Sequence, residues 1–549
     1  MSNEKPEAGA KHAILSSVFA ALLFVASSAA QARIINAASA SLADVRGAIA
    51  SAVHGDTVIV PAGTASWTSC LTITKSITIQ GQTTTNSDNG TASDQTILID
   101  NLVRVGGGQG YFHCSTSTAG QLLRITGITF SGQGGIQTIM PNGAIRFSGN
   151  PNVPVRIDHC HFMHLNHSPM ITVYDGLNGV SDHNIFDDFV GNNFSHSING
   201  ASYGDGAWAE RANYGSGTFF FMEDNYIWLS SYGGGAGGAV DSFYGAKYVF
   251  RYNHVFNSVT LGHSTGSSDP RGRGVRAMEI YNNDFHYSNT GGLDGTTSGS
   301  LIAHDNTFLG TLVTGWHLQV YRAFWSYGAP FYGADGSNAW DVNDPQLYES
   351  GAATGGSTST LLDTSKNWSA NRWSSYSVKR TEDNAMAWIT GNTNNTLNLY
   401  TWQNMNWSAG NHYQIHKVLI VLDQPGRGKG DLIRGNPPTP VGWPHQEQEP
   451  CYSWNNIHSP GGEHLNFVLA AGDTIHQNAD FYNDTPMPGY VPYVYPHPLT
   501  TGVQPPASAT PSSPHHPYKR KKENKKTKNK KEKKRQKKPA NEMAEPPRP

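Results

Sequence analysis

The sequence predicts an all-β solenoid, in which short strands stack as successive coils. The first observation behind this prediction is a repeated sequence motif, an asparagine followed two residues later by an apolar residue. The motif begins at Asn184, Asn225, Asn253, Asn283 and Asn306. The second observation is its spacing, which runs from 23 residues (Phe285 to Phe308) to 41 residues (Phe186 to Ile227). Repeats of about 20–50 residues are typical of solenoids, whose units bury their apolar faces only by stacking.

Asparagine suits the turn of such a coil because its side chain hydrogen-bonds nearby backbone and can pair with the same residue one coil away. Further upstream, Cys160-His161-Phe162 is a variant of this motif. The 41-residue step indicates one coil that carries a loop insertion.

The composition favours an exported all-β protein. The chain of 549 residues has 59 glycines, 24 tyrosines and only 15% charged residues. Lys11, the apolar run from Ala13 to Val25 and the Ala30-Gln31-Ala32 site predict a signal peptide over residues 1–32. We therefore expect a secreted protein that is extracellular, periplasmic or on the cell surface. The rest of the chain contains no apolar run long enough for a transmembrane segment.

The last part of the chain is strongly basic. Residues 519–538 hold 14 lysines and arginines against Glu523 and Glu532. We expect residues 501–549 to be a disordered Pro/Ser-rich and then Lys-rich tail that binds anionic polymers or the cell envelope, without a specific nucleic-acid function. The four cysteines leave disulfide pairing open, and the absence of a C-x-x-C motif argues against a cysteine zinc site.

The elements follow in order along residues 33–349, the expected solenoid with its cap. Ser41-Leu42-Ala43-Asp44 is a capping-box pattern, which predicts a helix with an apolar stripe that covers the first coil. Strands are expected at 57–60, 71–74 and 76–80, and further coils up to about residue 345.

Residues 350–417 predict a small inserted β-domain, because a Gly/Ser/Thr-rich stretch leads into alternating segments. Its tryptophans are either a core or a platform for sugars, and small β modules favour the core. Residues 418–500 are expected to hold the final coils and a Pro/Tyr-rich C-terminal wrap, with coils resuming at Val418 to Asp423 and a last repeat at Tyr452 to Asn456.

Three stretches resemble known proteins. Residues 55–64 with 71–81, and Met278 to Phe285, resemble coils of right-handed parallel β-helix proteins of the pectate lyase-like superfamily. Asp484 to Leu499 resembles the ending of bacterial secreted β-helix proteins of undefined activity. The resemblance covers about residues 40–500 and implies a right-handed parallel β-helix, expected to be monomeric. It leaves the reaction open, because this superfamily includes lyases, hydrolases, epimerases and non-enzymes.

Alternation within each strand sorts residues into inner and outer positions. The position three residues before the repeated asparagine should point inward, as Ile157, Met222, Phe250 and Ile280 illustrate. The next position should point outward and form a column on successive coils. Its members are Asp158, Asp182, Glu223, Arg251, Tyr281 and His304.

Three carboxylates in one column are candidate calcium ligands, since Ca²⁺ prefers several oxygens. In pectate lyases a metal held in this way neutralises the uronate carboxylate, and a nearby arginine removes the adjacent proton. The resemblance therefore implies Asp158, Asp182 and Glu223 as metal ligands and Arg251 or Arg276 as the base. Arg271 and Arg273, with Tyr281 and His304, would then bind substrate. The alternative is that these polar residues serve turn hydrogen bonding only.

Three functions remain open from the sequence. The first is a polysaccharide lyase that cleaves an acidic, uronate-containing polysaccharide by β-elimination. The second is a glycoside hydrolase, for which Asp187-Asp188 and His263, a candidate acid or base, resemble polygalacturonase signatures. The third is a non-catalytic glycan-binding or cell-surface protein, favoured by the Trp-rich insert and the basic tail.

Overall fold

The structure is a computed structural model of the whole chain. It describes a set of segments that excludes the two ends and several loops. These segments are residues 32–102, 110–116, 118–132, 143–165, 169–187, 194–200, 208, 210–229, 238–258, 260–263, 274–288, 295–311, 315–319, 347–374, 376–383, 385–400, 405–416, 424–429, 447–459, 461–471 and 475–502.

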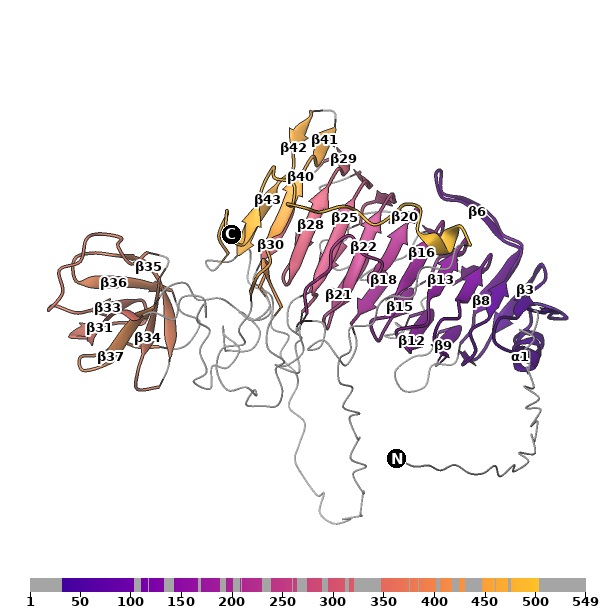
Figure 1. Cartoon of the computed structure of the whole chain (residues 1–549), viewed down its shortest axis with the longest axis horizontal. Coiled ribbons are helices and arrows are strands. Elements are labelled where there is room, and N and C mark those ends of the chain that lie inside the picture. Colours follow the sequence, from indigo (N-terminus) through magenta and orange to yellow (C-terminus); the bar gives the residue numbers. More distant parts are fainter. Residues whose placement is uncertain are drawn as a thin grey trace, which may run out of the picture. The chain divides into compact units, whose positions relative to one another are not determined.

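Three long sheets, here called A, B and C, run through these segments (Figure 1). Sheet A contains β1 (Ile34–Asn36), β2 (Thr57–Ile59), β5 (Thr78–Gln80), β10 (Leu123–Thr126), β13 (Val155–Asp158), β16 (Gly179–Asp182), β19 (Phe220–Glu223), β22 (Lys247–Arg251), β25 (Ala277–Tyr281), β28 (Ser300–His304), β40 (Cys451–Trp454) and β44 (Phe481–Tyr482). Sheet B contains β3 (Gly63–Trp67), β8 (Thr96–Asp100), β11 (Thr129–Ser131), β14 (His161–Met163), β17 (Ile185–Asp187), β20 (Tyr226–Trp228), β23 (His254–Phe256), β26 (Asp284–Tyr287), β29 (Thr307–Gly310), β41 (Ile457–Ser459) and β42 (Glu463–His464). Sheet C contains β4 (Leu71–Ile73), β9 (Phe112–Thr116), β12 (Ile145–Gly149), β15 (Ile171–Val173), β18 (Phe194–Asn199), β21 (Gly238–Phe243), β24 (Thr260–Gly262), β27 (Gly295–Thr296), β30 (Trp316–Gln319) and β43 (Phe467–Ala471).

The chain visits sheets A, B and C in turn, and each strand pairs in parallel with the strand one coil earlier. Only the last strand of sheet B, β42, pairs antiparallel among the strands of these three sheets. This architecture is a right-handed parallel β-helix, and the predicted fold class is confirmed. Among the described residues, no helix is long and apolar enough to span a membrane.

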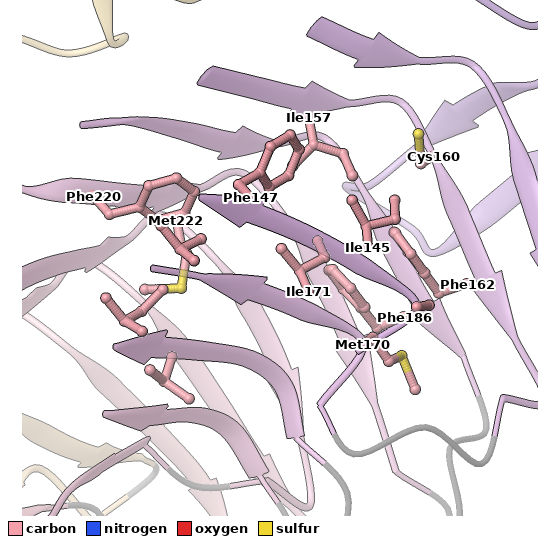
Figure 2. Close-up of a cluster of buried hydrophobic side chains, with 14 of the residues drawn as sticks. Ile145, Phe147, Ile157, Cys160, Phe162, Met170, Ile171, Phe186, Phe220 and Met222 are labelled. Carbon is pink, nitrogen blue, oxygen red and sulfur yellow. The ribbon is translucent and has the colours of Figure 1, made fainter. Parts of the chain in front are cut away.

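The interior of the β-helix is a continuous apolar core. Side chains from all three sheets meet there, as Figure 2 shows for Ile157 of sheet A, Phe162 of sheet B and Ile145 of sheet C. Phe162 and Phe186 stack across neighbouring coils with ring centroids 4.8 Å apart. The inward position predicted for Ile157, Met222, Phe250 and Ile280 is confirmed, because all four are buried in this core.

The repeated asparagines form a ladder between sheets A and B. Each side-chain amide donates to the Oδ1 of the asparagine one coil further on. The donor–acceptor distances are 3.1 Å from Asn184 to Asn225, 3.0 Å to Asn253, 3.0 Å to Asn283, 2.9 Å to Asn306 and 2.8 Å to Asn456. The same Oδ1 atoms also accept from backbone amides; Asn225 Oδ1, for example, accepts from the Asn184 amide at 3.0 Å. The ladder therefore satisfies buried polar groups of two coils at once, which the sequence predicted from the repeat.

The N-terminal end carries the expected helix, α1 (Leu42–Ser51). Ser41 Oγ accepts from the Asp44 amide at 3.2 Å, which confirms the predicted cap. Val45 and Ile49 are buried, whereas Val53 lies beyond the helix end and is 50% exposed. The Asp44 carboxylate accepts from the Ser39 hydroxyl instead of completing the capping box.

The insert is a seven-stranded antiparallel sheet with a core of its own. In sheet order, its strands are β31 (Leu347–Ala352), β37 (His412–His416), β34 (Ser377–Arg380), β35 (Met386–Asn392), β36 (Thr396–Tyr400), β33 (Thr360–Leu362) and β32 (Gly355–Gly356). Trp368, Trp373 and Trp407 are buried in this core. They therefore have the structural role that the sequence favoured, while the side chains of Trp388 and Trp402 lie outside the described part.

Coils resume after the insert, although the predicted strand at Val418 to Asp423 lies outside the described residues. A short antiparallel pair, β38 (Arg427–Gly428) and β39 (Glu447–Gln448), precedes β40. Asn456 then joins the asparagine ladder, which confirms the last predicted repeat. Cys70, Cys114, Cys160 and Cys451 are free thiols.

A hairpin of β6 (Thr84–Asn86) and β7 (Thr91–Ser93) extends from an early coil and is anchored on sheet B. Asp94 follows the hairpin directly, and its Oδ1 lies 2.9 Å from His161 Nδ1. The other ring nitrogen of His161, Nε2, lies 3.8 Å from Asp187 Oδ2. Burial favours the neutral ring, but the carboxylates of Asp187 and Asp94 outweigh it and raise the pKa of His161 to about 9.

The asparagine ladder yields a first prediction. Replacement of Asn253 by alanine should lower the free energy of unfolding by on the order of 3 kcal/mol, because the change leaves several buried backbone and amide groups without partners. The control is Asn282→Gly, one residue outside the ladder, where φ is 55° and glycine is tolerated. Denaturant titration measures both, and equal effects would contradict a special role for the ladder.

The hairpin anchor yields a second prediction. Because the folded pKa of His161 is raised, its stabilisation is complete below the ordinary histidine pKa and is lost as pH rises through about 9. The melting temperature of the native protein should therefore exceed that of His161→Gln at pH 6, and the difference should shrink towards pH 10. A difference that stays constant over this range would exclude a charged His161 anchor.

Candidate functional site

The predicted column on sheet A exists, and its six members are paired in register on adjacent strands. The order of the column is Asp158, Asp182, Glu223, Arg251, Tyr281 and His304. All six side chains are buried, however. The structure therefore differs from the exposed face that the sequence predicted at this position.

Each carboxylate of the column is held by a guanidinium group from a neighbouring strand. Arg124 donates to Asp158 at 2.7 Å and 2.5 Å, and Arg156 donates to Asp182 at 2.9 Å and 2.7 Å. Burial alone would raise the pKa of Asp158, but the hydrogen bonds from Arg124 and His159 hold it well below its usual range. The sequence analysis missed Arg124 and Arg156, although Arg156 stands two residues before Asp158 and therefore on the same side of the strand.

Glu223 and Arg251 form the third pair, in which Arg251 donates at 2.8 Å and 2.6 Å. The remaining donors of Arg251 bond the Tyr281 hydroxyl at 2.9 Å and the backbone oxygens of Tyr493 and Val494 at 2.7 Å and 2.9 Å. With its donors used and its side chain fully buried, Arg251 is placed as a clamp and not as a base that reaches substrate.

The cover over the column is the C-terminal strap, residues 490–500, which ends in the short helix η1 (Pro498–Thr500) (Figure 1). The His497 amide donates to Glu223 at 2.7 Å, and Arg156 donates to the Leu499 oxygen at 3.1 Å. The Tyr490 hydroxyl donates to Glu279. Burial raises the pKa of Glu279 to about 7, despite this hydrogen bond. The wrap predicted for the final coil thus extends back to β13 and β16.

The other predicted site residues have structural surroundings as well. Arg276 is fully buried, with Nη2 beside Glu449 at 2.5 Å and its guanidinium 5.2 Å from the Trp208 ring. Tyr281 and His304 stack with centroids 4.7 Å apart, and His304 stacks on Trp454 at 4.3 Å. Arg271 and Arg273 lie outside the described residues.

The oxygens expected to bind calcium therefore already accept from Arg124, Arg156 and Arg251. In the described segments, no group of three or more His, Cys, Asp or Glu side chains is placed to hold a metal ion. Arginines on the same face thus neutralise these carboxylates, and calcium binding by them stays a prediction.

His263 is the one predicted catalytic residue that lies in a partly exposed polar setting. It follows β24 of sheet C, and its Nδ1 lies 2.6 Å from Asp241 Oδ1 on the neighbouring β21. The two side chains are 20% and 17% exposed. The ring of Phe243, on the same strand as Asp241, lies 6.2 Å from the His263 ring. Asp241 was missed, because nothing in the sequence shows which strand pairs beside His263.

Further polar residues share this outer face of sheet C. Register pairs Arg146 with Thr172, Thr172 with Ser197 and Ser197 with Asp241, which places Arg146 and Asp241 in one row. The Arg146 guanidinium lies 4.1 Å from the centroid of the Tyr174 ring.

Tyr174 keeps its proton at neutral pH in this setting. Burial raises its pKa, Tyr244 and Asp175 add to the rise, and Arg146 and Asn199 offset it only in part. At the far end, His113 Nε2 lies 3.3 Å from the Ser148 hydroxyl, and burial together with Arg146 lowers the pKa of His113. The face from His113 to His263 thus combines a cation, protonated hydroxyl groups and a carboxylate-bound imidazole.

Comparisons with known proteins add little to this geometry. No protein-family model matches the chain, and no curated protein matches it. A solved structure of an alginate lyase from Paenibacillus sp. str. FPU-7 is similar over 51% of this chain and 97% of that chain, at 14% identity and a TM-score of 0.29. At that TM-score the similarity carries no argument about function.

The hydrolase signature is not assembled around His263. Asp187 lies on β17 of sheet B beside His161, whereas His263 follows a strand of sheet C. Asp188 lies outside the described residues. On the described sheet C face, the carboxylates are Asp175 and Asp241, and Asp241 is engaged by His263.

The buried pairs under the strap yield a third prediction. Arg251→Met should lower the free energy of unfolding by about 3–5 kcal/mol, because it leaves Glu223 buried and uncompensated. The double variant with Glu223→Gln should recover part of that loss. Denaturant titration of both variants gives the measurement, and a double variant that is no more stable than Arg251→Met would show that the ion pair is not what holds this region.

Proposed function

We propose that the protein is a polysaccharide lyase that cleaves a uronate-containing polymer by β-elimination on the outer face of sheet C. The observation that carries the proposal is that the outer side of sheet C combines two partly exposed pairs, Asp241–His263 and Arg146–Tyr174, along one row in which Thr172 and Ser197 between them are buried. The column on sheet A offers similar residue types, but these are buried under the strap. Export from the cytoplasm, predicted from residues 1–32, belongs to the same proposal.

β-Elimination needs a base that removes the proton on the carbon next to the uronate carboxylate. The electron pair then forms a carbon–carbon double bond, and the glycosidic bond on the adjacent carbon breaks. His263 is the candidate base, because Asp241 Oδ1 lies 2.6 Å from its Nδ1, which leaves Nε2 as the nitrogen that accepts the proton. Asp241 orients the ring and stabilises the imidazolium that forms.

The leaving oxygen needs a proton from an acid. Tyr244 is the candidate, because it follows the strand of Asp241 and its ring packs 5.0 Å from Phe243, the neighbour of His263. Coils repeat about every 4.8 Å, so Arg146 lies about four coils from His263. We therefore assign Arg146 to the carboxylate of a more distant sugar. Arg271 and Arg273 follow His263 in the chain and remain the proposed partners of the reacting carboxylate.

The fourth prediction tests this assignment by ultraviolet absorbance of the new double bond, over a panel of polyuronates. The native protein should produce absorbance with at least one polymer, and His263→Gln should lower kcat by about 100-fold or more. Arg146→Ala should mainly raise KM, because it removes binding that the ground state and transition state share.

The matched control is His412→Gln. His412 Nδ1 lies 2.9 Å from Glu382 Oε1, a histidine–carboxylate pair of the same kind in the insert. It should leave kcat unchanged. Equal losses in both histidine variants would contradict a base at His263. New reducing ends without absorbance would indicate a hydrolase, and neither signal across the panel would indicate a non-catalytic glycan-binding protein.

A further inference from the structure

The outer face of sheet B presents a second, chemically different surface. Its strands align two outward positions. From β20 to β29, the first row of outward side chains consists of Tyr226, His254, Asp284 and Thr307. From β17 to β29, the second row consists of Asp187, Trp228, Phe256, His286 and Leu309. All of these side chains are partly exposed, whereas Thr129, His161 and Ile185, earlier in the first row, are buried. We call the partly exposed set the sheet B face.

The hairpin β6–β7 marks one boundary of the sheet B face. His161 and Asp94 anchor the hairpin over the early coils. A Cβ at Gly90, near the hairpin tip, would lie 2.5 Å from the Tyr226 ring, so the tip packs directly on Tyr226. From Tyr226 onwards the outward side chains of the described face are partly exposed.

Aromatic rings dominate this face. Phe256 and His286 stack with centroids 4.5 Å apart, and Tyr226 packs on Phe256 at 5.0 Å. Trp228 is partly exposed and pairs with no other ring among the described residues. Rings in register on coils about 4.8 Å apart match the rise of sugars in an extended chain. The electron-rich face of an indole attracts the C–H groups on one side of a sugar ring.

The charge of the face selects the kind of sugar. The eleven strands of sheet B contain neither lysine nor arginine. Asp187 and Asp284 supply carboxylates that are 41% and 44% exposed. Each of them lies beside a histidine, Asp187 near His161 and Asp284 near His254, so the face offers a uronate carboxylate no excess of positive charge. The carboxylate oxygens still accept hydrogen bonds from sugar hydroxyls. Sheet C, with Arg146 on its face, has the opposite character.

We propose that the sheet B face binds an uncharged, hydroxyl-rich polysaccharide, with the Trp228 ring as its stacking platform. This site is separate from the elimination site on sheet C and does not depend on it. Its role is to hold the protein on a neutral glycan while sheet C acts on an acidic polymer.

The test is affinity electrophoresis of the full-length protein in native gels that contain a neutral glucan, xylan or galactomannan. The native protein should be retarded by at least one of them, at low and at high salt. Trp228→Ala should weaken the binding by about tenfold or more, as expected for a central tryptophan. Phe256→Ala should weaken it in the same direction.

Tyr452→Ala is the matched control, because Tyr452 is a partly exposed ring that stacks on Tyr482 at 5.2 Å on sheet A. It should leave the retardation unchanged. His263→Gln should also leave it unchanged, which separates this proposal from the one for sheet C.

Three outcomes would overturn the proposal. The first is no retardation by any neutral polysaccharide, or equal retardation of the native protein and Trp228→Ala. The second is retardation that disappears when residues 503–549 are deleted, which would assign the binding to the basic tail. The third is a dimer in light scattering that Trp228→Ala converts to a monomer, which would make the face an interface between two copies.

Discussion

The hydrogen bonds between asparagine side chains of successive coils are the constraint on which the rest of the β-helix depends. Each of these amides is buried, and each joins two coils through one Oδ1 that accepts from a side chain and from a backbone amide. A slip of one residue would leave these buried groups unpaired, at a cost of about 1–3 kcal/mol for each. The ladder therefore holds the register at the corner between sheets A and B, and every column on the neighbouring sheets follows from it.

The fixed register makes each outer face a set of columns, and what covers a face decides its role. On sheet A, the column from Asp158 to His304 lies under the strap, so its charged groups are desolvated and must be paired. Arg124, Arg156 and Arg251 supply that pairing. These charged side chains would suit catalysis on an exposed surface. Under the strap, their ion pairs and hydrogen bonds instead hold the C-terminal segment against earlier coils.

The faces of sheets B and C remain partly exposed and differ in charge. Sheet C carries Arg146 and the Asp241–His263 pair. Sheet B carries aromatic rings and the carboxylates of Asp187 and Asp284, with no lysine or arginine in its strands. One solenoid can in this way offer separate surfaces to an acidic and to an uncharged polymer, because outward side chains of different sheets do not share a face.

The sequence alone determined the coil repeat, the asparagine ladder, the capping helix, the separate insert and the alignment of the column on sheet A. These features depend on local turns and on alternation along a strand, which neighbouring residues specify. The candidate site was predicted less well. His263 was singled out, but Asp241, Arg146 and Tyr174 were not, because each lies on a different coil.

The tertiary structure decided which faces are covered. Arg251 donates a hydrogen bond to the Val494 oxygen, 243 residues later in the sequence. Glu223 accepts one from the His497 amide, 274 residues later. Nothing local to Arg251 or Glu223 shows that a distant segment will desolvate them. Burial of a polar column depends on contacts made by the far end of the chain, and these exist only once the coils have stacked.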